Sequence, residues 1–349
     1  MTTDEKYMQR CLQLALNGKG QVSPNPMVGA VVVCDNKIIG EGYHRQYGKA
    51  HAEVNAINSV KDRLLLKRST IYVSLEPCSH YGKTPPCSQL IIDSQIPRVV
   101  VGCLDPYPAV SGRGIKMLRN AGIDVKIGVL EKEALQLNKE FITAQTKNRP
   151  YIYLKWAQTQ DGFIDKIREE GEEPCPTPIS NDFTKILVHK IRSEVSSIMI
   201  GTNTAVKDNP SLTTRLWYGK SPVRIILDRQ GRIPFNATIF DGSAETIIFT
   251  ERDSYENRIK HVSFEKVSFD DNLFEQIFLV LKRKNINSIL VEGGRQTLQS
   301  LIDKQLWDEA YIEISNAVFG NGTKAPTIDG RILDEQNWKT SRHLHLSLT

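Results

Sequence analysis

The chain has 349 residues, of which 40% are hydrophobic and 24% charged, an ordinary composition for a soluble globular protein. Its 45 basic and 40 acidic residues give a formal net charge of +5 without a dense basic run, so nucleic-acid binding is not indicated. No stretch approaches the roughly 20 apolar residues of a membrane span, and the polar residues 1–6 lead into no signal-peptide core. Six cysteines are too few for a disulfide scaffold, so we expect a protein of the reducing cytoplasm.

The first half of the chain alternates strand and helix patterns. Residues 28–34 and 38–41 predict a hairpin across Asp35 and Asn36. A helix is expected from His51, and a second helix is expected from Cys87, after two prolines. The remaining predicted elements are strands at 71–75, 98–103 and 124–127 and helices at 114–121 and 131–141. This order predicts a three-layer α/β/α domain.

A second α/β domain is expected after the polar, turn-prone residues 147–150. The length suits two domains, which we place at residues 1–146 and 147–349. The charged, proline-rich residues 168–178 predict a surface loop. Strands are predicted at 151–156, 197–201, 223–227, 246–249, 288–291 and 309–314, and helices at 182–194 and 272–283.

A candidate metal site is formed by His51, Cys78 and Cys87. One imidazole and two thiolates can hold a zinc ion whose fourth position stays open for water, and such an ion lowers the pKa of that water to about 7. Glu53 lies two residues after His51 and can transfer the proton without binding the metal. The pattern is typical of zinc deaminases, except that these have a second cysteine three residues after the first.

Two other interpretations of these residues stay open. His-x-Glu occurs on many helix surfaces, and cysteines in a reducing compartment are commonly small buried side chains. A zinc-stabilised binding module without catalysis would need a fourth protein ligand, for which His44 and His80 are the nearby candidates. The free carboxylate of Glu53 speaks against that module, because a structural zinc needs no acid beside it.

Several stretches together resemble the bifunctional pyrimidine deaminase/reductases of riboflavin biosynthesis. The stretches are residues 24–29, the triplet His51-Ala52-Glu53 and residues 76–87, whose long cysteine spacing is specific to that family. Residues 208–213 and 291–294 extend the resemblance over nearly the whole chain. It implies a cytidine-deaminase-like N-terminal domain and a dihydrofolate-reductase-like C-terminal domain.

The resemblance also implies two reactions. One is zinc-dependent deamination of 2,5-diamino-6-ribosylamino-4(3H)-pyrimidinone 5′-phosphate with Glu53 as the catalytic residue, and the other is reduction of the ribosyl to a ribityl chain by NADPH. The partner is then a phosphorylated pyrimidine, with no nucleic acid and no membrane, and we expect a homo-oligomer. The substrate contacts implied in the first domain are Asn25, His80, Lys83 and Asp105, of which Lys83 could pair with the ribose phosphate.

The second domain has no G-x-G-x-x-G after a predicted strand, so a Rossmann site is not indicated. Instead, strand 288–291 runs into Glu292-Gly293-Gly294 and a helical segment at 296–302, where the backbone can approach a pyrophosphate. The resemblance implies NADPH contacts at Gln158, Thr204, Asp208, Gly294, Arg295, Gln296, Thr297, Leu298, Gln299 and Ser300. It implies substrate contacts at Lys155, Arg192, Leu212, Arg215 and Glu292, with Arg215 on the phosphate.

Two departures from the family pattern bear on function. Pro178 stands where the family usually has Trp, so a stacking contact to the cofactor is missing and a deaminase with an impaired reductase domain is the alternative. Tyr107 stands where the family usually has Asn, which removes any substrate contact of that side chain.

Overall fold

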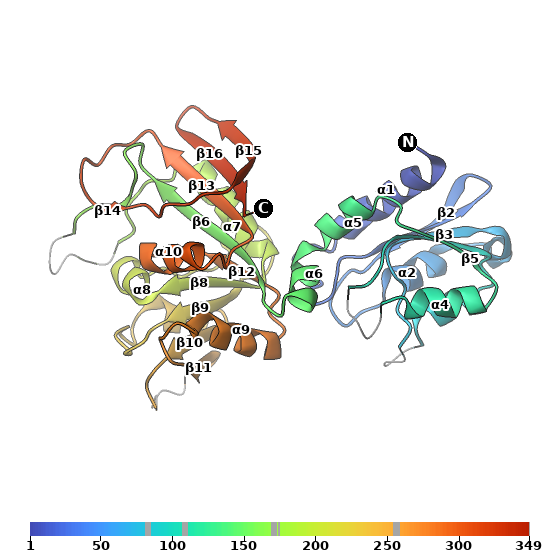
Figure 1. Cartoon of the computed structure of the whole chain (residues 1–349), viewed down its shortest axis with the longest axis horizontal. Coiled ribbons are helices and arrows are strands. Elements are labelled where there is room, and N and C mark those ends of the chain that lie inside the picture. The colour runs from blue at the N-terminus through green and yellow to red at the C-terminus, as the bar shows by residue number, and fades with distance from the viewer. Residues whose placement is uncertain (81–84, 107–110, 169–172, 174, 254–258, 349) are drawn as a thin grey trace. The chain divides into compact units, whose positions relative to one another are not determined.

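The structure is a computed structural model that describes residues 1–80, 85–106, 111–168, 173, 175–253 and 259–348. The predicted contact Lys83 and the variant position Tyr107 lie outside these residues. The chain divides into two compact units, Met1–Asn148 and Arg149–Thr349, which run from blue to green and from green to red in Figure 1. None of the helices in the described ranges combines the length and apolarity needed to cross a membrane.

The first unit is built on a five-stranded mixed sheet in the order β2-β1-β3-β4-β5. The hairpin β1–β2 is antiparallel, as predicted, and β1 also pairs antiparallel with β3, whereas β3, β4 and β5 are parallel. The strands are β1 (Gly29–Cys34), β2 (Lys37–Tyr43), β3 (Thr70–Leu75), β4 (Arg98–Cys103) and β5 (Asp124–Ile127).

Helices cover both faces of this sheet. On one face Val32 and Val101 pack with α2, α3 and α4, and on the other Val31 and Val100 pack with α1. Neighbouring residues of a strand point to opposite faces, so a strand buried on both faces is apolar throughout. This confirms the predicted three-layer arrangement. The helices are α1 (Thr3–Leu16), α2 (Ala52–Ser59), α3 (Cys87–Asp93), α4 (Arg113–Asn120), α5 (Glu131–Leu137) and α6 (Lys139–Thr146), with a 3₁₀ turn at Arg63–Arg68.

Two helical features of this unit differ from the prediction. Helix α1 was not predicted, although Thr2 and Glu5 form a capping box at its start. The single helix predicted at 131–141 is wrong, because it is interrupted at Asn138. The Asn138 carboxamide accepts a hydrogen bond from Met27 N at 2.8 Å and donates one to Met27 O at 2.9 Å. This distant partner draws Asn138 out of helical geometry, to φ −106° and ψ 21°.

The second unit has a nine-stranded sheet in the order β11-β10-β9-β8-β12-β6-β13-β16-β15. The first seven strands of this order, from β11 at the edge to β13, are all parallel. Strand β16 pairs antiparallel with β13, and β15 pairs antiparallel with β16 at the other edge. The strands are β6 (Tyr151–Gln158), β8 (Ser197–Gly201), β9 (Val223–Leu227), β10 (Thr246–Thr250), β11 (Val262–Lys266), β12 (Ser288–Val291), β13 (Glu309–Ser315), β15 (Arg331–Asn337) and β16 (Ser341–Ser347). A separate ribbon pairs β7 (Phe163–Asp165) with β14 (Thr323–Lys324).

Helices lie on both faces of the large sheet as well. Helices α9 and α10 bury Ile277 and Leu301 against one face, while Ile191 of α7 and Ala205 of α8 pack on the other. The carboxyl ends of the parallel strands β6, β8, β9 and β12 therefore meet at one edge, where ligands of open α/β sheets bind. The helices are α7 (Asp182–Glu194), α8 (Thr202–Asp208), α9 (Leu273–Arg283) and α10 (Arg295–Asp303), with a 3₁₀ turn at Thr238–Phe240.

Candidate active sites

The predicted metal ligands come together in the first unit. The ligand atoms of His51, Cys78 and Cys87 all lie within 4.8 Å of one another. His51 Nδ1 is 3.7 Å from Cys78 Sγ and 3.4 Å from Cys87 Sγ. A tetrahedral zinc ion with Zn–S of about 2.3 Å and Zn–N of about 2.0 Å needs ligand atoms about 3.6 Å apart. The three side chains therefore fit zinc in its usual geometry.

Helix starts hold these ligands in place. His51 is the N-cap residue of α2, and Cys87 is the first residue of α3, directly after Pro86. The N–H of Cys87 donates to Cys78 Sγ at 3.2 Å. A helix N-terminus stabilises negative charge, so the Cys78 thiol, which accepts this N–H, lies where the thiolate form is favoured. The hydrogen bond between the thiols lowers the pKa of Cys78 and raises the pKa of Cys87.

Glu53 lies in the first turn of α2 and is 3% exposed. Burial, followed by the negative charge of Cys78, raises the pKa of Glu53 to about 7. A carboxyl group of this kind can both accept and return a proton near neutral pH. The metal cluster found among the described residues does not include Glu53, in agreement with a proton-transferring role rather than a ligand role.

Asn25, a predicted substrate contact, is held by a histidine. Its Nδ2 lies 3.2 Å from Nε2 of His44, whose Nδ1 lies 3.1 Å from the carbonyl oxygen of Ala50. His44 is 3% exposed, and burial lowers its pKa. A neutral ring that donates from Nδ1 to Ala50 O accepts from the Asn25 amide at Nε2. His44 is therefore occupied elsewhere and is not a fourth metal ligand in the described cluster.

Glu76 is a positioning group that the sequence analysis treated only as part of a motif. Its carboxylate accepts hydrogen bonds from the N–H groups of Asp105, Gly112, Gly114 and Ile115, at 2.9 to 3.3 Å. It thus fixes the segment after β4 to the start of α4, next to the turn that carries Cys78. A buried carboxylate accepting several backbone donors is a signal that only the folded structure reveals.

The other predicted contacts of this unit are less buried. His80 is exposed, and Asp105 is partly exposed on the segment that Glu76 holds. Both lie beside the turns that carry the cluster, His80 two residues after Cys78. Both residues lie in loops, as the resemblance implies.

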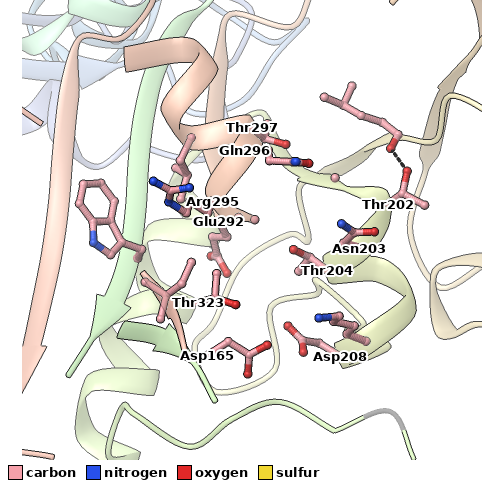
Figure 2. A pocket seen from close by; sticks show the side chains of 18 of the residues that line it. Asp165, Thr202, Asn203, Thr204, Asp208, Glu292, Arg295, Gln296, Thr297 and Thr323 are labelled. Atoms are coloured by element: carbon pink, nitrogen blue, oxygen red, sulfur yellow. Dashed lines mark hydrogen bonds between the residues drawn. The ribbon is translucent and has the colours of Figure 1, made fainter. Parts of the chain in front are cut away.

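A large cavity of about 1350 Å³ lies at the carboxyl edge of the second unit's parallel strands. It exceeds the about 300–1,000 Å³ of usual ligand pockets, so it has room for a cofactor and a substrate together. Figure 2 shows side chains from α8, including Thr204 and Asp208, across from those at the start of α10, including Arg295 and Gln296. The predicted cofactor residues that line it are Thr204, Asp208, Gly294, Arg295, Gln296, Thr297, Leu298 and Ser300.

The two glycines after β12 form part of the cavity wall. Their peptide bond is cis, and Gly293 has φ of 136°, a conformation that favours glycine. A Cβ atom on Gly294 would lie 3.0 Å from the Thr204 hydroxyl. Gly294 is also the N-cap residue of α10, whose free N–H groups suit a phosphate. The backbone is therefore open to a ligand at this turn.

A charged cluster at the cavity was missed by the sequence analysis. Arg168 lies 3.0 Å from Asp165 and 2.7 Å from the predicted cofactor residue Asp208. It also donates to the carbonyl oxygen of Lys207 at 2.7 Å. Desolvation by burial raises the pKa of Asp208, against the effect of Arg168. The only sequence signal was the charge of residues 168–178, which we assigned to a surface loop.

A second charged group surrounds Lys155, which lines the cavity with Glu292. The guanidinium of Arg192 binds both oxygens of Glu292, at 2.5 and 2.9 Å, and both side chains are close to 10% exposed, at 12% and 11%. Burial lowers the pKa of Lys155, although Glu292 and Glu313 oppose this effect. A lysine of lowered pKa can exchange a proton more readily than a solvated one.

Five predicted residues are not among the described residues that line the cavity: Gln158, Arg192, Leu212, Arg215 and Gln299. Arg215 donates its N–H to His189 Nδ1 at 2.9 Å and a guanidinium N–H to Thr213 Oγ1 at 3.0 Å. Leu212 is buried in a hydrophobic core cluster of the second unit. Gln158 accepts from Trp156 Nε1 at 2.8 Å, and Gln299 binds the backbone of Thr327. Pro178, the position of the missing Trp, does line the cavity.

Two family models match separate parts of the chain. Residues 1–103 match the cytidine and deoxycytidylate deaminase zinc-binding region, and residues 150–347 match the RibD C-terminal domain. The first match contains the whole metal cluster, and the second contains the whole cavity.

Relatives match both halves together. A riboflavin biosynthesis protein RibD of Aquifex aeolicus is 40% identical over 95% of this chain and 92% of its own length. That of Escherichia coli is 35% identical over 92% of this chain and 90% of its own. The solved structure of a diaminohydroxyphosphoribosylaminopyrimidine deaminase/5-amino-6-(5-phosphoribosylamino)uracil reductase from Thermotoga maritima has a TM-score of 0.88 at 38% identity, covering 99% of this chain and 98% of that one. The solved structure of Acinetobacter baumannii RibD has a TM-score of 0.89 at 30% identity, covering 99% of this chain and 99% of that one.

Proposed function

Because the chain belongs to the family of bifunctional deaminase/reductases of riboflavin biosynthesis, we propose that it performs two steps on one phosphorylated pyrimidine. The first is hydrolytic deamination of 2,5-diamino-6-ribosylamino-4(3H)-pyrimidinone 5′-phosphate. The second is NADPH-dependent reduction of the ribosyl chain to ribityl. The observation that carries the first step is the convergence of His51, Cys78 and Cys87 beside a buried Glu53.

For deamination, His51, Cys78 and Cys87 would hold the zinc, which supplies a Lewis acid and hydroxide near neutral pH. Glu53 takes the proton of the attacking water at its carboxylate and delivers it to the departing amine. Asn25, oriented by His44, is proposed to bind the pyrimidine. His80, Lys83 and Asp105 are proposed to complete the substrate site.

For reduction, NADPH supplies the hydride. Gly294 and the residues of α10 up to Ser300, with Thr204 and Asp208, are proposed to hold the cofactor along the cavity wall. Lys155, Arg192, Leu212 and Glu292 are proposed to surround the sugar, and Arg215 to bind its phosphate through a charge-assisted hydrogen bond.

The substitution at Pro178 does not remove the cavity wall. Pro178 lines the cavity with Pro176 and Ile179, so an apolar surface is present where the family usually places Trp. Similarity over both halves of the chain favours a working reductase over an impaired one.

The test is mass analysis of the products formed from the pyrimidine substrate with and without NADPH. Without NADPH we expect the deaminated compound and ammonia, and with NADPH the reduced, deaminated compound. Release of ammonia without any reduction at saturating NADPH would contradict the second step alone. Absence of both products would contradict the assignment as a whole.

We also propose that each compact unit carries one activity, the deaminase in residues 1–146 and the reductase in residues 147–349. A chain cut after Asn148 should yield a first fragment that still binds zinc, because all three ligands lie before the cut. A soluble first fragment without zinc would contradict this. Reduced thiols at Cys78 and Cys87 suit the cytoplasm, where we place the protein. The homo-oligomer is a prediction that analytical ultracentrifugation tests.

A further inference from the structure

One buried carboxylate of the second unit is left half unsatisfied. Glu313 on β13 is 3% exposed. Its Oε2 accepts a hydrogen bond from Ser180 Oγ at 2.5 Å. Its Oε1 has no hydrogen-bond partner, and it is the one buried side-chain polar atom in the described ranges of which this holds. A buried acceptor without a donor is costly, so its retention points to a donor that arrives with a ligand.

The strand register places Glu313 beside the cavity. In the parallel pair β6–β13, Tyr311 lies opposite Lys155 and Glu313 lies opposite Ala157. Residues two apart on a strand share a face, so Glu313 lies on the same face of the sheet as Lys155. Lys155, Ala157 and the partner Ser180 all line the cavity. The carboxylate of Glu313 also acts electrostatically on the Lys155 amine.

Glu292 lies on the other side of Lys155. Val291 of β12 is opposite Leu154, so the next residue, Glu292, falls beside Lys155. Three charged side chains therefore cross neighbouring strands in the order Glu292, Lys155, Glu313. Two strand spacings across the sheet and two residues along the strands separate the backbones of the outer two, or roughly 12 Å.

The two ends of this row differ in charge. Glu292 is paired with Arg192, and Arg192 and Arg215 both donate to Thr213, so two cations gather at this end. At the Glu313 end, one carboxylate oxygen is free of hydrogen bonds. A ligand with an anion at one end and N–H donors at the other matches this order. A phosphoribosylated aminopyrimidine has this character, since its phosphate and its ring stand at opposite ends of the sugar.

We propose that Glu313 is a substrate-binding residue of the reductase, whose Oε1 accepts a hydrogen bond from an N–H group of the pyrimidine ring. The phosphate then lies toward Arg215, and the sugar passes Lys155 and Glu292. This rests on the proposed function for the identity of the substrate. In this arrangement Glu313 contacts only the pyrimidine ring, whereas Arg215 contacts only the phosphate.

The experiment compares full-length protein with Glu313→Met, which keeps the length of the side chain and removes both oxygens. Affinities are measured by calorimetry for 5-amino-6-(5-phosphoribosylamino)uracil and for ribose 5-phosphate, which lacks the ring. We expect the affinity for the pyrimidine to fall about ten- to hundredfold, the range of a charge-assisted hydrogen bond, and that for ribose 5-phosphate to stay unchanged. Glu313→Gln, which keeps a neutral acceptor, should give a smaller loss.

Steady-state reduction provides the second measurement. In Glu313→Met the KM for the pyrimidine should rise by a similar factor, with the KM for NADPH unchanged. The thermal midpoint should not fall, because a buried unpaired carboxylate is removed. Unchanged pyrimidine affinity would overturn the proposal, and so would an effect on NADPH alone, which would place Glu313 at the cofactor. If the parent binds the pyrimidine but never reduces it, the proposed reductase activity fails while the binding comparison still decides the role of Glu313.

Glu309 supplies a matched control on the same strand and face. It is 2% exposed, and its oxygens are occupied by Tyr151 Oη at 2.8 Å, Tyr311 Oη at 3.2 Å and His345 Nε2 at 3.0 Å. Glu309→Gln should lower the thermal midpoint and leave the pyrimidine affinity unchanged. If Glu313→Met instead behaves like this control, Glu313 is a structural residue and the proposal is overturned.

Discussion

The metal centre and the reductase cavity are assembled in different ways. The metal centre takes its ligands from His51, Cys78 and Cys87, at the starts of two helices and the end of one strand, within a short part of the chain. The cavity takes its lining from strand ends and helix starts spread from Lys155 to Thr323. A metal needs a few atoms at fixed distances, which a compact motif can supply, whereas a dinucleotide and a substrate need an extended surface.

The largest effect is expected from a substitution that removes a metal ligand and leaves the cavity unchanged. Cys87→Ser should abolish zinc binding and deamination, because a hydroxyl is a poor zinc ligand at neutral pH. NADPH-dependent reduction of the deaminated substrate should persist, since the cavity residues lie in the second unit. Metal analysis and ammonia release are the measurements. Cys103→Ser is the control, because Cys103 is also buried but lies outside the metal cluster.

A smaller effect separates the metal from the proton transfer beside it. Glu53→Gln should keep stoichiometric zinc and lower the deamination rate by about 10²–10⁴-fold, the usual contribution of a general acid–base. Both quantities are measured on one preparation. A near-parental rate would show that another group moves the proton, and a loss of zinc would make Glu53 part of the metal centre after all.

Two substitutions in the second unit should each weaken the binding of one ligand, either NADPH or the sugar-phosphate substrate. Gly294→Val should raise the KM for NADPH at least about tenfold, because the added side chain meets the Thr204 hydroxyl at the turn that we assign to the cofactor. Arg215→Ala should instead weaken the sugar-phosphate substrate, by roughly ten- to hundredfold. Steady-state kinetics with each ligand varied separates the two. A normal NADPH response in Gly294→Val would move the cofactor site elsewhere.

The smallest effect concerns stability and leaves both sites intact. Asp4 of α1 binds Arg98, Tyr72 and Lys126, and the Arg98 hydrogen bond holds the pKa of Asp4 well below its usual range. A lowered folded pKa stabilises the fold above the unfolded pKa of about 3.9 and ceases to do so as the pH falls.

Asp4→Asn should therefore lower the free energy of unfolding of the first unit by about 1.5–3 kcal/mol at pH 7. The difference from the parent should shrink as the pH falls below about 4, because Asp4 is then protonated in the unfolded chain. Thermal unfolding at several pH values measures this. A difference that does not depend on pH would mean that the carboxylate charge is not the cause.

The difference between the compact metal centre and the extended cavity also explains which site residues could be predicted from the sequence. Cys78 follows a clear apolar strand and Cys87 follows two prolines, so the metal ligands could be placed from local patterns alone. The strands of the large sheet were predicted where they are apolar, but the edge strands β11 and β15 and the strand β16 were not. Every residue of β15 is exposed, so it has no apolar face to signal a strand. The cavity residues were named through the family resemblance, since no local pattern brings Asp208 to Arg168, 40 residues away.

Contacts over long sequence separations account for what was missed. The break at Asn138 depends on Met27, which is 111 residues earlier in the chain. The unsatisfied oxygen of Glu313 exists only because β13 inserts between β6 and β16 and buries it. Such features follow from the packed arrangement, which propensity and periodicity do not specify.

The Asn138 contact also has a consequence for biosynthesis on the ribosome. Through Met27 it fixes the backbone two residues after Asn25, the residue that we propose binds the pyrimidine, so this segment takes its final form only when residue 138 has left the exit tunnel. That residue precedes the end of the first unit at Asn148. Domains generally fold as units, the N-terminal one first, during synthesis at about 5–20 residues per second. The first unit can therefore be complete while the second unit is still being translated.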